Sequence, residues 1–150
     1  MNIKEQDGFT LIEVVVALGV LAFGILGMIV MQYSGTKGNM TADTITTAAM
    51  LASDQIEQIF RLDYDDAIIT DTSGGNVTVA LAGLDDTDSP AADYSTTTTV
   101  AGGTYNLYVN TAENYPMPDT KTIRVIVSRL ERGTIRNVTY NYIKAKRIEN

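Results

Sequence analysis

The sequence of 150 residues contains no cysteine and no histidine. The absence of cysteine excludes a disulfide framework, a Cys-ligated metal site and thiol catalysis. The absence of histidine removes the commonest general base and the commonest metal ligand. The sequence also shows no recognisable nucleophile–base arrangement. It therefore disfavours an enzyme and offers no catalytic, cofactor-binding or metal-binding residue.

Basic residues are scarce in most of the chain. Residues 1–120 carry three basic side chains against sixteen acidic ones, whereas residues 121–150 carry eight against two. Such asymmetry can indicate attraction to nucleic acid or to a membrane surface, or head-to-tail packing of subunits. The interpretation we favour is a single domain with two faces of opposite charge.

An unbroken run of eighteen residues that are apolar or glycine extends from Val14 to Met31. As a helix it would span about 27 Å, close to the hydrocarbon thickness of a bilayer. A cleaved secretory signal has a shorter apolar region and an Ala-x-Ala-like exit, whereas this run ends in Gln32-Tyr33-Ser34-Gly35. The run therefore predicts a retained membrane anchor, with residues 9–33 as its helical segment and 1–8 as a short polar leader.

A second helical pattern follows a polar stretch, Ser34–Asn39, that contains two glycines and is a candidate weak point. Apolar residues then recur at spacings of three and four, which predicts one face of an amphipathic helix. These residues are Ile45, Ala49, Ala52, Ile56 and Ile59. The simplest prediction is one long helix from Thr10 to about Leu62, with an amphipathic half over residues 34–62.

The remaining residues, 63–150, have the composition of a β domain. Strands are expected at Asn76–Leu81, at Tyr94–Val100 and Thr104–Asn110 as a hairpin, and at Thr122–Leu130 and Thr134–Ile143 as a second hairpin. The second hairpin should turn at Glu131-Arg132-Gly133. The predicted fold class is α+β, in which the long helix packs on a C-terminal antiparallel sheet.

Glu13 is the anomaly of the N-terminal segment, because it lies next to the apolar run. An ionised side chain at bilayer depth costs about 2.5–3.5 kcal/mol on insertion scales. The run contains no Lys or Arg, so the nearest available cation would be a new α-amino group made by cutting the chain before Phe9. Alternatively, Glu13 lies at the interface and its carboxylate reaches water. The residues alone leave both possibilities open.

Gly8-Phe9-Thr10-Leu11-Ile12-Glu13, followed by the apolar run, resembles the processing and methylation site of type IV prepilins and type II secretion pseudopilins. The resemblance implies that a prepilin peptidase cuts after Gly8 and methylates Phe9. It also implies that Glu13 sets the position of the subunit among other pilin subunits by meeting a neighbour's N-terminal amine. The protein would then sit in the cytoplasmic (inner) membrane with its C-terminal domain outside the cytoplasm, and afterwards in the pilus.

A weaker resemblance covers Ala49–Phe60 and the final hairpin, which look like the minor pilins described as PilV-like pilus-modification proteins. The function this implies is that of a minor pilin that contributes to assembly or priming of a type IV pilus. A minor pseudopilin of a type II secretion system, or an adhesin or DNA-binding module displayed on a filament, are the alternatives. The leader departs from the family because it is near neutral rather than basic.

Two further patterns have simpler interpretations. Asp85-Asp86-Thr87-Asp88-Ser89 and Asp63-Tyr64-Asp65-Asp66 carry oxygen ligands suited to Ca²⁺, but both lack the Gly and the distant Glu of an EF-hand loop, and we interpret them as solvated loops. Tyrosine and basic residues in the C-terminal third would suit single-stranded nucleic acid. Ordinary strand composition also explains them, so the sequence disfavours a nucleic-acid partner. The residues are Tyr105, Tyr108, Tyr115, Tyr140, Tyr142, Arg124, Arg136, Lys144 and Lys146.

Overall fold

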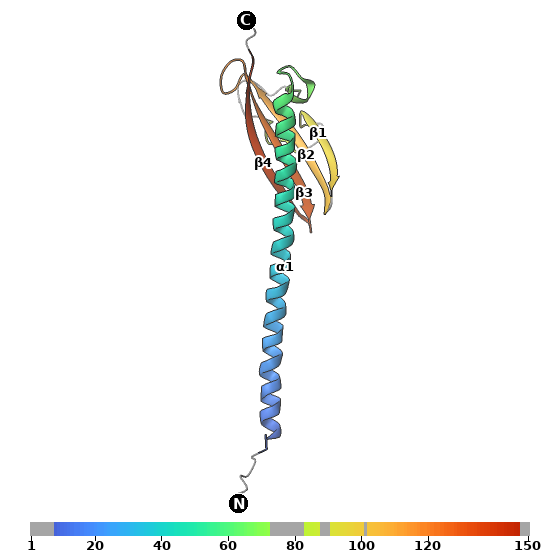
Figure 1. The fold of residues 1–150 in the computed structure, drawn as a ribbon, viewed down its shortest axis with the longest axis vertical. Coiled ribbons are helices and arrows are strands. Elements are labelled where there is room, and N and C mark those ends of the chain that lie inside the picture. Colours follow the sequence, from blue (N-terminus) through green and yellow to red (C-terminus); the bar gives the residue numbers. More distant parts are fainter. Residues whose placement is uncertain (1–7, 73–82, 88–90, 101, 148–150) are drawn as a thin grey trace, which may run out of the picture. The chain divides into compact units, whose positions relative to one another are not determined.

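The computed structural model describes residues 8–72, 83–87, 91–100 and 102–147. Within them the order of elements is helix α1 (Leu11–Arg61), the 3₁₀ turn η1 (Ala67–Ile69), and strands β1 (Tyr94–Val100), β2 (Gly103–Glu113), β3 (Thr120–Glu131) and β4 (Thr134–Ala145) (Figure 1). The predicted α+β fold is confirmed, since one long N-terminal helix precedes a four-stranded antiparallel sheet. The strand expected at Asn76–Leu81 lies outside the described residues.

The chain divides into two compact units, Met1–Thr41 and Ala42–Asn150. The first contains the apolar part of α1, and every described residue from Gly8 to Met40 is exposed in it. The second contains the rest of α1 and the sheet. Helix α1 is continuous through Ser34–Asn39, so the two glycines there do not end it.

The sheet is a meander in the order β1-β2-β3-β4. Its registers pair Thr96 with Leu107, Val109 with Val125, and Val127 with Val138. The turn between β3 and β4 has positive φ at Arg132 (49°) and Gly133 (81°), which matches the backbone of a type I′ hairpin. Strand β2 is longer than predicted because residues 110–113 continue to pair with β3 after β1 has ended.

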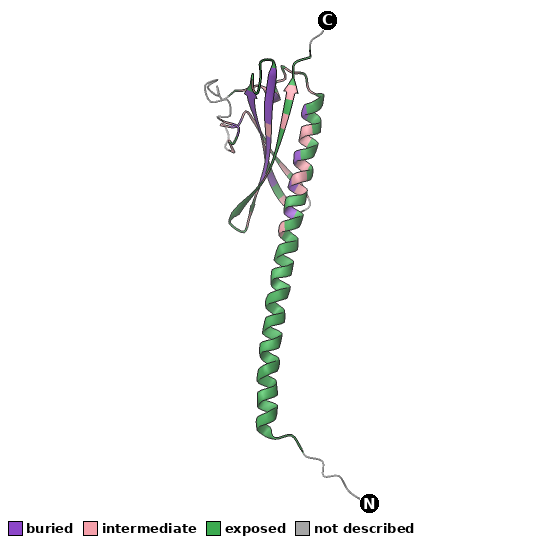
Figure 2. Ribbon diagram, turned by 90° about the vertical axis from the view of Figure 1, so that its left-hand side faces the viewer, coloured by how far each residue is buried: buried purple, intermediate pink, exposed green. Residues whose placement is uncertain are grey.

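The core lies between the sheet and the C-terminal part of α1. Alternate residues of β2 and β3 are buried against Ala48, Ala52 and Ile59 of the helix (Figure 2). The sheet residues in this core are Tyr105, Leu107, Val109, Ile123, Val125 and Val127. The last three alternate along β3 and so share one face of that strand. Burial of so many aliphatic side chains supplies the main stabilisation of this unit.

The predicted helix stripe was wrong at its N-terminal end. The buried positions are Thr44, Ala48, Ala52 and Ile59, whereas Ile45 is exposed and Ala49 is only half-buried. Thr44 lies in the stripe because its hydroxyl accepts a hydrogen bond from Arg129 Nη1 at 3.3 Å. The polar residue Thr44 is therefore buried where the apolar spacing predicted burial of Ile45.

Two lysines of the sheet fix the segment that follows α1. Lys144 Nζ donates to the carbonyl oxygens of Ile59 (2.8 Å), Phe60 (3.4 Å) and Leu62, which are acceptors that a helix C-terminus leaves unpaired. Burial lowers the pKa of Lys144. The buried Lys121 donates to Ile69 O at 3.0 Å and forms an ion pair with Glu113.

Arg129 connects the opposite end of the helix segment to the sheet. Its guanidinium donates to Tyr105 Oη at 2.9 Å, to Thr44 and to the carbonyl oxygen of Gly102. A Cβ at Gly103, whose φ is +145°, would lie 2.6 Å from Arg129 Nη2. Glycine at 103 therefore permits both the backbone of the β1–β2 turn and the close approach of this arginine.

The other face of the sheet is partly covered by residues 83–87. Asn110 is buried, and its Nδ2 donates to the carbonyl oxygens of Leu84 and Asp86, each at 2.9 Å. Leu84 is only 1% exposed. This short segment thus packs on the face of β2 and β3 that α1 does not cover.

Candidate processing and assembly site

Thr10 determines where α1 begins. Its hydroxyl accepts a hydrogen bond from Glu13 N at 3.3 Å, and its carbonyl accepts from Glu13 N (3.1 Å) and Val14 N (3.3 Å). Thr10 is therefore the N-cap residue, and Glu13 is at position N3. Threonine at the N-cap with glutamate at N3 is the residue pattern of a capping box. The start of the helix thus follows from the residues of the motif themselves.

Gly8 precedes the helix and is exposed. An added Cβ at Gly8 would meet no atom within 4 Å, and its φ lies outside the left-handed region. The fold therefore has no steric reason to require glycine at this position. A glycine that the fold does not need, beside an exposed peptide bond, fits recognition by a molecule outside the chain, such as a peptidase.

The first turns of α1 present apolar side chains on all sides. Phe9 is 83% exposed, and no residue of the most apolar eighteen-residue window of the helix is buried within the chain. Among the described residues, α1 is the one helix long and apolar enough to cross a membrane. Removing this surface from water would contribute on the order of tens of kcal/mol, since each large aliphatic side chain contributes about 1.5–3.

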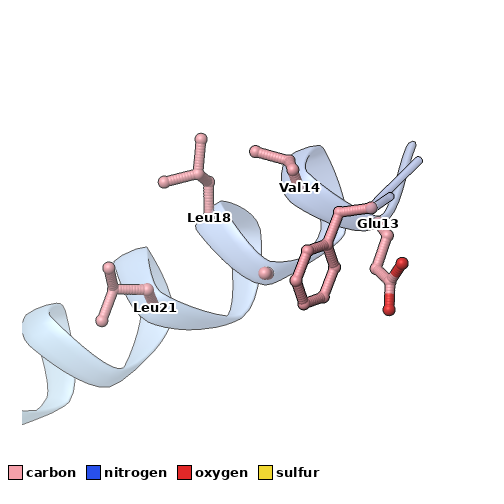
Figure 3. Close-up of a pocket in the computed structure, with 6 residues that line it drawn as sticks. Glu13, Val14, Leu18 and Leu21 are labelled. Atoms are coloured by element: carbon pink, nitrogen blue, oxygen red, sulfur yellow. The ribbon is translucent and has the colours of Figure 1, made fainter. Parts of the chain in front are cut away.

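The Glu13 carboxylate interrupts this apolar surface. Figure 3 shows it directed to a different side of the helix from the side chains of Val14 and Leu18. Phe9, Glu13, Val14, Ala17, Leu18 and Leu21 together line a shallow concavity. The nearest basic residues in the sequence are Lys4 and Lys37. The insertion cost of one carboxylate, about 2.5–3.5 kcal/mol at a helix centre, is small beside the gain from the apolar run, so Glu13 does not prevent insertion.

A cut between Gly8 and Phe9 would place an α-amino group four residues before Glu13. Phe9 lies just before the N-cap residue Thr10, so the new amine would stand at the N-terminal end of the helix that carries Glu13 at its third position. In an environment without water, an ammonium and a carboxylate attract one another much more strongly than at a surface. The arrangement can therefore form an ion pair within a subunit or between subunits.

Side chains of both acidic runs, residues 63–66 and 85–89, make contacts within the domain. Asp66 Oδ1 accepts from Ile68 N at 2.9 Å and caps η1, while Asp85 pairs with Arg124. The described residues contain no cluster of three or more acidic side chains arranged to hold a metal ion. Asp88 and Ser89 of the second run lie outside the described residues.

The tyrosine and basic residues of the C-terminal third do not form one surface. Tyr105 is buried beside Arg129, and Lys144 caps α1, both on the helix-facing side of the sheet. Tyr108 and Arg124 lie on the other side, since their strand neighbours Val109 and Val125 belong to the core. Residues of this set therefore lie on both faces of the described sheet.

Thr10 is the site residue that the sequence reasoning overlooked. Its signal was present, because Thr-x-x-Glu ahead of an apolar run is a known helix-start pattern. The structure brings Gly8, Phe9, Thr10 and Glu13 together within the last residues before α1 and its first turn.

Comparison with known proteins agrees with this reading of the N-terminus. Residues 3–29 match the family model of the prokaryotic N-terminal methylation motif. No curated protein and no solved structure is significantly similar to the chain. The chain therefore carries a type IV prepilin-like N-terminal methylation motif, and it does so on a pilin-like α+β fold.

Proposed function

We propose that the chain is a minor pilin of a type IV pilus, made as a prepilin and contributing to pilus assembly or priming. The observation that carries the proposal is the exposed Gly8–Phe9 bond directly ahead of a capped, unburied apolar helix that contains Glu13. The methylation motif over residues 3–29 supports it. The role is structural rather than catalytic.

In this proposal residues 1–8 are the leader, 9–33 the membrane-spanning half of the helix, 34–62 its amphipathic half, and 63–150 the β domain. Prepilin peptidase cuts after Gly8 on the cytoplasmic side and methylates Phe9. The chain then lies in the inner membrane with residues from Gln32 onward outside the cytoplasm, because the described residues hold one candidate span and no second one to bring the chain back.

Glu13 acts in the step from membrane to filament. The apolar surface of α1 can be covered by lipid or by the same surface of other pilin subunits. A neighbour's N-terminal amine is the cation that the apolar run lacks. Pairing with it would fix the axial position of the subunit, because an ion pair in a water-poor core tolerates little displacement.

A minor pseudopilin of a type II secretion system has the same N-terminal chemistry and is the alternative. The test is deletion of the gene followed by complementation, with two readouts in the same strain. Loss of surface pili, and recovery of the chain in sheared filaments after complementation, are the expected results. Normal piliation with loss of a secreted protein would contradict the pilus assignment and favour the pseudopilin.

A further inference from the structure

The sheet face that α1 does not cover is polar but uncharged where β1 pairs with β2. The β2 residues that alternate with the core residues Tyr105, Leu107 and Val109 lie on this face, together with their partners in β1. All of them carry a hydroxyl or an amide, whereas protein surfaces ordinarily include many Lys, Arg, Glu and Asp side chains. The residues are Ser95, Thr97, Thr99, Thr104, Asn106 and Tyr108.

Two cross-strand pairs of this face line a hollow. Ser95 lies directly opposite Tyr108, and Thr97 lies directly opposite Asn106. Together with Thr96 these residues line a volume of about 310 Å³. Pockets that hold small ligands measure about 300–1,000 Å³, so this space is large enough for a small polar molecule or for one end of a longer one. We call it the β1–β2 hollow.

The β1–β2 hollow is open to solvent and to the edge of the sheet. Ser95, Thr97 and Asn106 are exposed. Residues 83–87 cover the same face further along β2, where Asn110 donates to two of their carbonyl oxygens. Strand β1 is the outer strand of the sheet (Figure 1), so its outward main-chain groups have no neighbouring strand within the described part of the chain. A ligand can therefore reach both the side chains and this edge.

One hydrogen bond orients the amide of the β1–β2 hollow. Thr97 Oγ1 donates to Asn106 Oδ1 at 3.1 Å, which leaves the N–H donors of Asn106 Nδ2 for another partner. Among the described residues, no hydrogen bond engages this Nδ2 or the hydroxyls of Ser95 and Tyr108. The hollow thus presents neutral donors and neutral acceptors side by side on one pair of strands.

The chemistry of the β1–β2 hollow favours a neutral, polyhydroxylated ligand. An anionic ligand would lose water without gaining a cation, because the lining residues are uncharged and Arg124 on the same face is paired with Asp85. An apolar ligand would cover hydroxyl and amide groups that need partners. A sugar ring avoids both costs, since each of its hydroxyls donates and accepts, and its C–H surface can pack on the ring of Tyr108. Antibody combining sites use the same combination of rigid Tyr rings with Ser and Asn.

We propose that the β1–β2 hollow binds an uncharged oligosaccharide. A sugar ring would lie against Tyr108, with its hydroxyls accepting from Asn106 Nδ2 and pairing with the Ser95 hydroxyl, and the following ring would extend along the exposed edge of β1. The inference goes beyond the proposed pilin function and does not depend on it, because every residue of the hollow belongs to the compact unit Ala42–Asn150.

The test uses the full chain, with the apolar run of α1 shielded by an amphipathic polymer that carries no sugar. Saturation-transfer NMR measures the binding of cellotetraose, maltotetraose, mannotetraose and chitotetraose, each at millimolar concentration. Asn106→Ala removes the amide, Tyr108→Leu removes the aromatic ring, and Tyr108→Phe keeps the ring. Asn137→Ala is the matched control, because Asn137 is an exposed asparagine on the same face, in line with Asn106 but two strands away, at roughly 10 Å.

At least one of the tetrasaccharides should show saturation transfer from the wild-type chain. Asn106→Ala and Tyr108→Leu should each weaken its binding about fivefold or more, which corresponds to about 1 kcal/mol, the net contribution of one hydrogen bond. Tyr108→Phe and Asn137→Ala should leave it within about twofold of wild type. Melting curves check that each variant is folded, and Asn106→Ala, at an exposed position, decides the matter if Tyr108→Leu is not.

Three results would overturn the inference. The first is no saturation transfer to any of the tetrasaccharides, or binding that Asn106→Ala leaves unchanged. The second is tighter binding of a sulfated oligosaccharide that weakens with salt, which would indicate a charge-driven site elsewhere on the chain. The third is binding of an uncharged peptide of alternating threonine and valine in place of the sugars, which would indicate that the edge of β1 accepts an added strand instead.

Discussion

Replacing Glu13 by leucine should separate membrane insertion from filament assembly. The N-cap bond survives the substitution, because Thr10 Oγ1 accepts from the backbone N–H of residue 13 and not from its side chain. The helix start loses only the attraction of a carboxylate to the helix dipole, about 0.3–1 kcal/mol. Removing the carboxylate from lipid gains up to about 2.5–3.5 kcal/mol. Glu13→Leu should therefore insert at least as well as the wild-type chain, and it should still be cut after Gly8.

Incorporation of Glu13→Leu into filaments should fall, although its membrane insertion does not. If a neighbour's amine pairs with Glu13 in a water-poor filament core, removing one partner leaves an uncompensated charge at a cost of about 3–5 kcal/mol. That cost corresponds to a loss of about two to four orders of magnitude in incorporation. Glu13→Asp, with a carboxylate one methylene shorter, should be partly incorporated.

The assay is quantification of each version in sheared filaments and in membranes, in cells that contain an active prepilin peptidase. Equal amounts in membranes with loss from filaments is the expected pattern for Glu13→Leu. Normal incorporation of Glu13→Leu would refute the reasoning and show that this subunit is recruited without its carboxylate. Reduced membrane insertion of Glu13→Leu would instead contradict the estimate that removing the carboxylate from lipid gains more than the helix start loses.

Three further predictions concern the domain and its location. In a fragment that begins at Ser34, Ile59→Asp should lower the free energy of unfolding by several kcal/mol, because Ile59 is fully buried. Gln58→Asp, at an exposed position, is the control. Equal melting curves for the two variants would contradict the packing of the helix on the sheet. Burial, followed by the charge of Glu113, raises the pKa of Tyr64 above 10.0. Stability should therefore fall as pH rises past 10.0 and through the raised pKa, and Tyr64→Phe should lack that loss in denaturant titrations. A reporter fused after Asn150 that is active only when exported should be active, and activity of a cytoplasm-only reporter there would contradict the topology.

The fold was predictable wherever a pattern was local. The helix expected from Thr10 to Leu62 runs from Leu11 to Arg61, because the apolar run and the later three-and-four spacing both persist over many turns. The hairpin turn at Glu131-Arg132-Gly133 was predicted from the residues of the turn itself, and it has positive φ at Arg132 and Gly133. The processing motif is likewise contiguous, which is why Gly8, Phe9 and Glu13 stood out in the sequence.

Contacts between distant residues were not predictable in the same way. Lys144 caps a helix that ends more than eighty residues earlier, and Arg129 bonds to Thr44 across a similar separation. No local spacing indicates such pairs. The Arg129–Thr44 bond also explains the misplaced helix stripe, since a threonine that finds a partner in the domain can be buried in place of Ile45.

Intact-mass measurement of the membrane-extracted protein tests the central claim most directly. In cells with an active prepilin peptidase, the account predicts a chain that has lost Met1–Gly8 and gained one methyl group on Phe9. A matched strain without the peptidase should retain the unmodified Met1. A mature chain that still begins at Met1 where the peptidase is active would contradict the account.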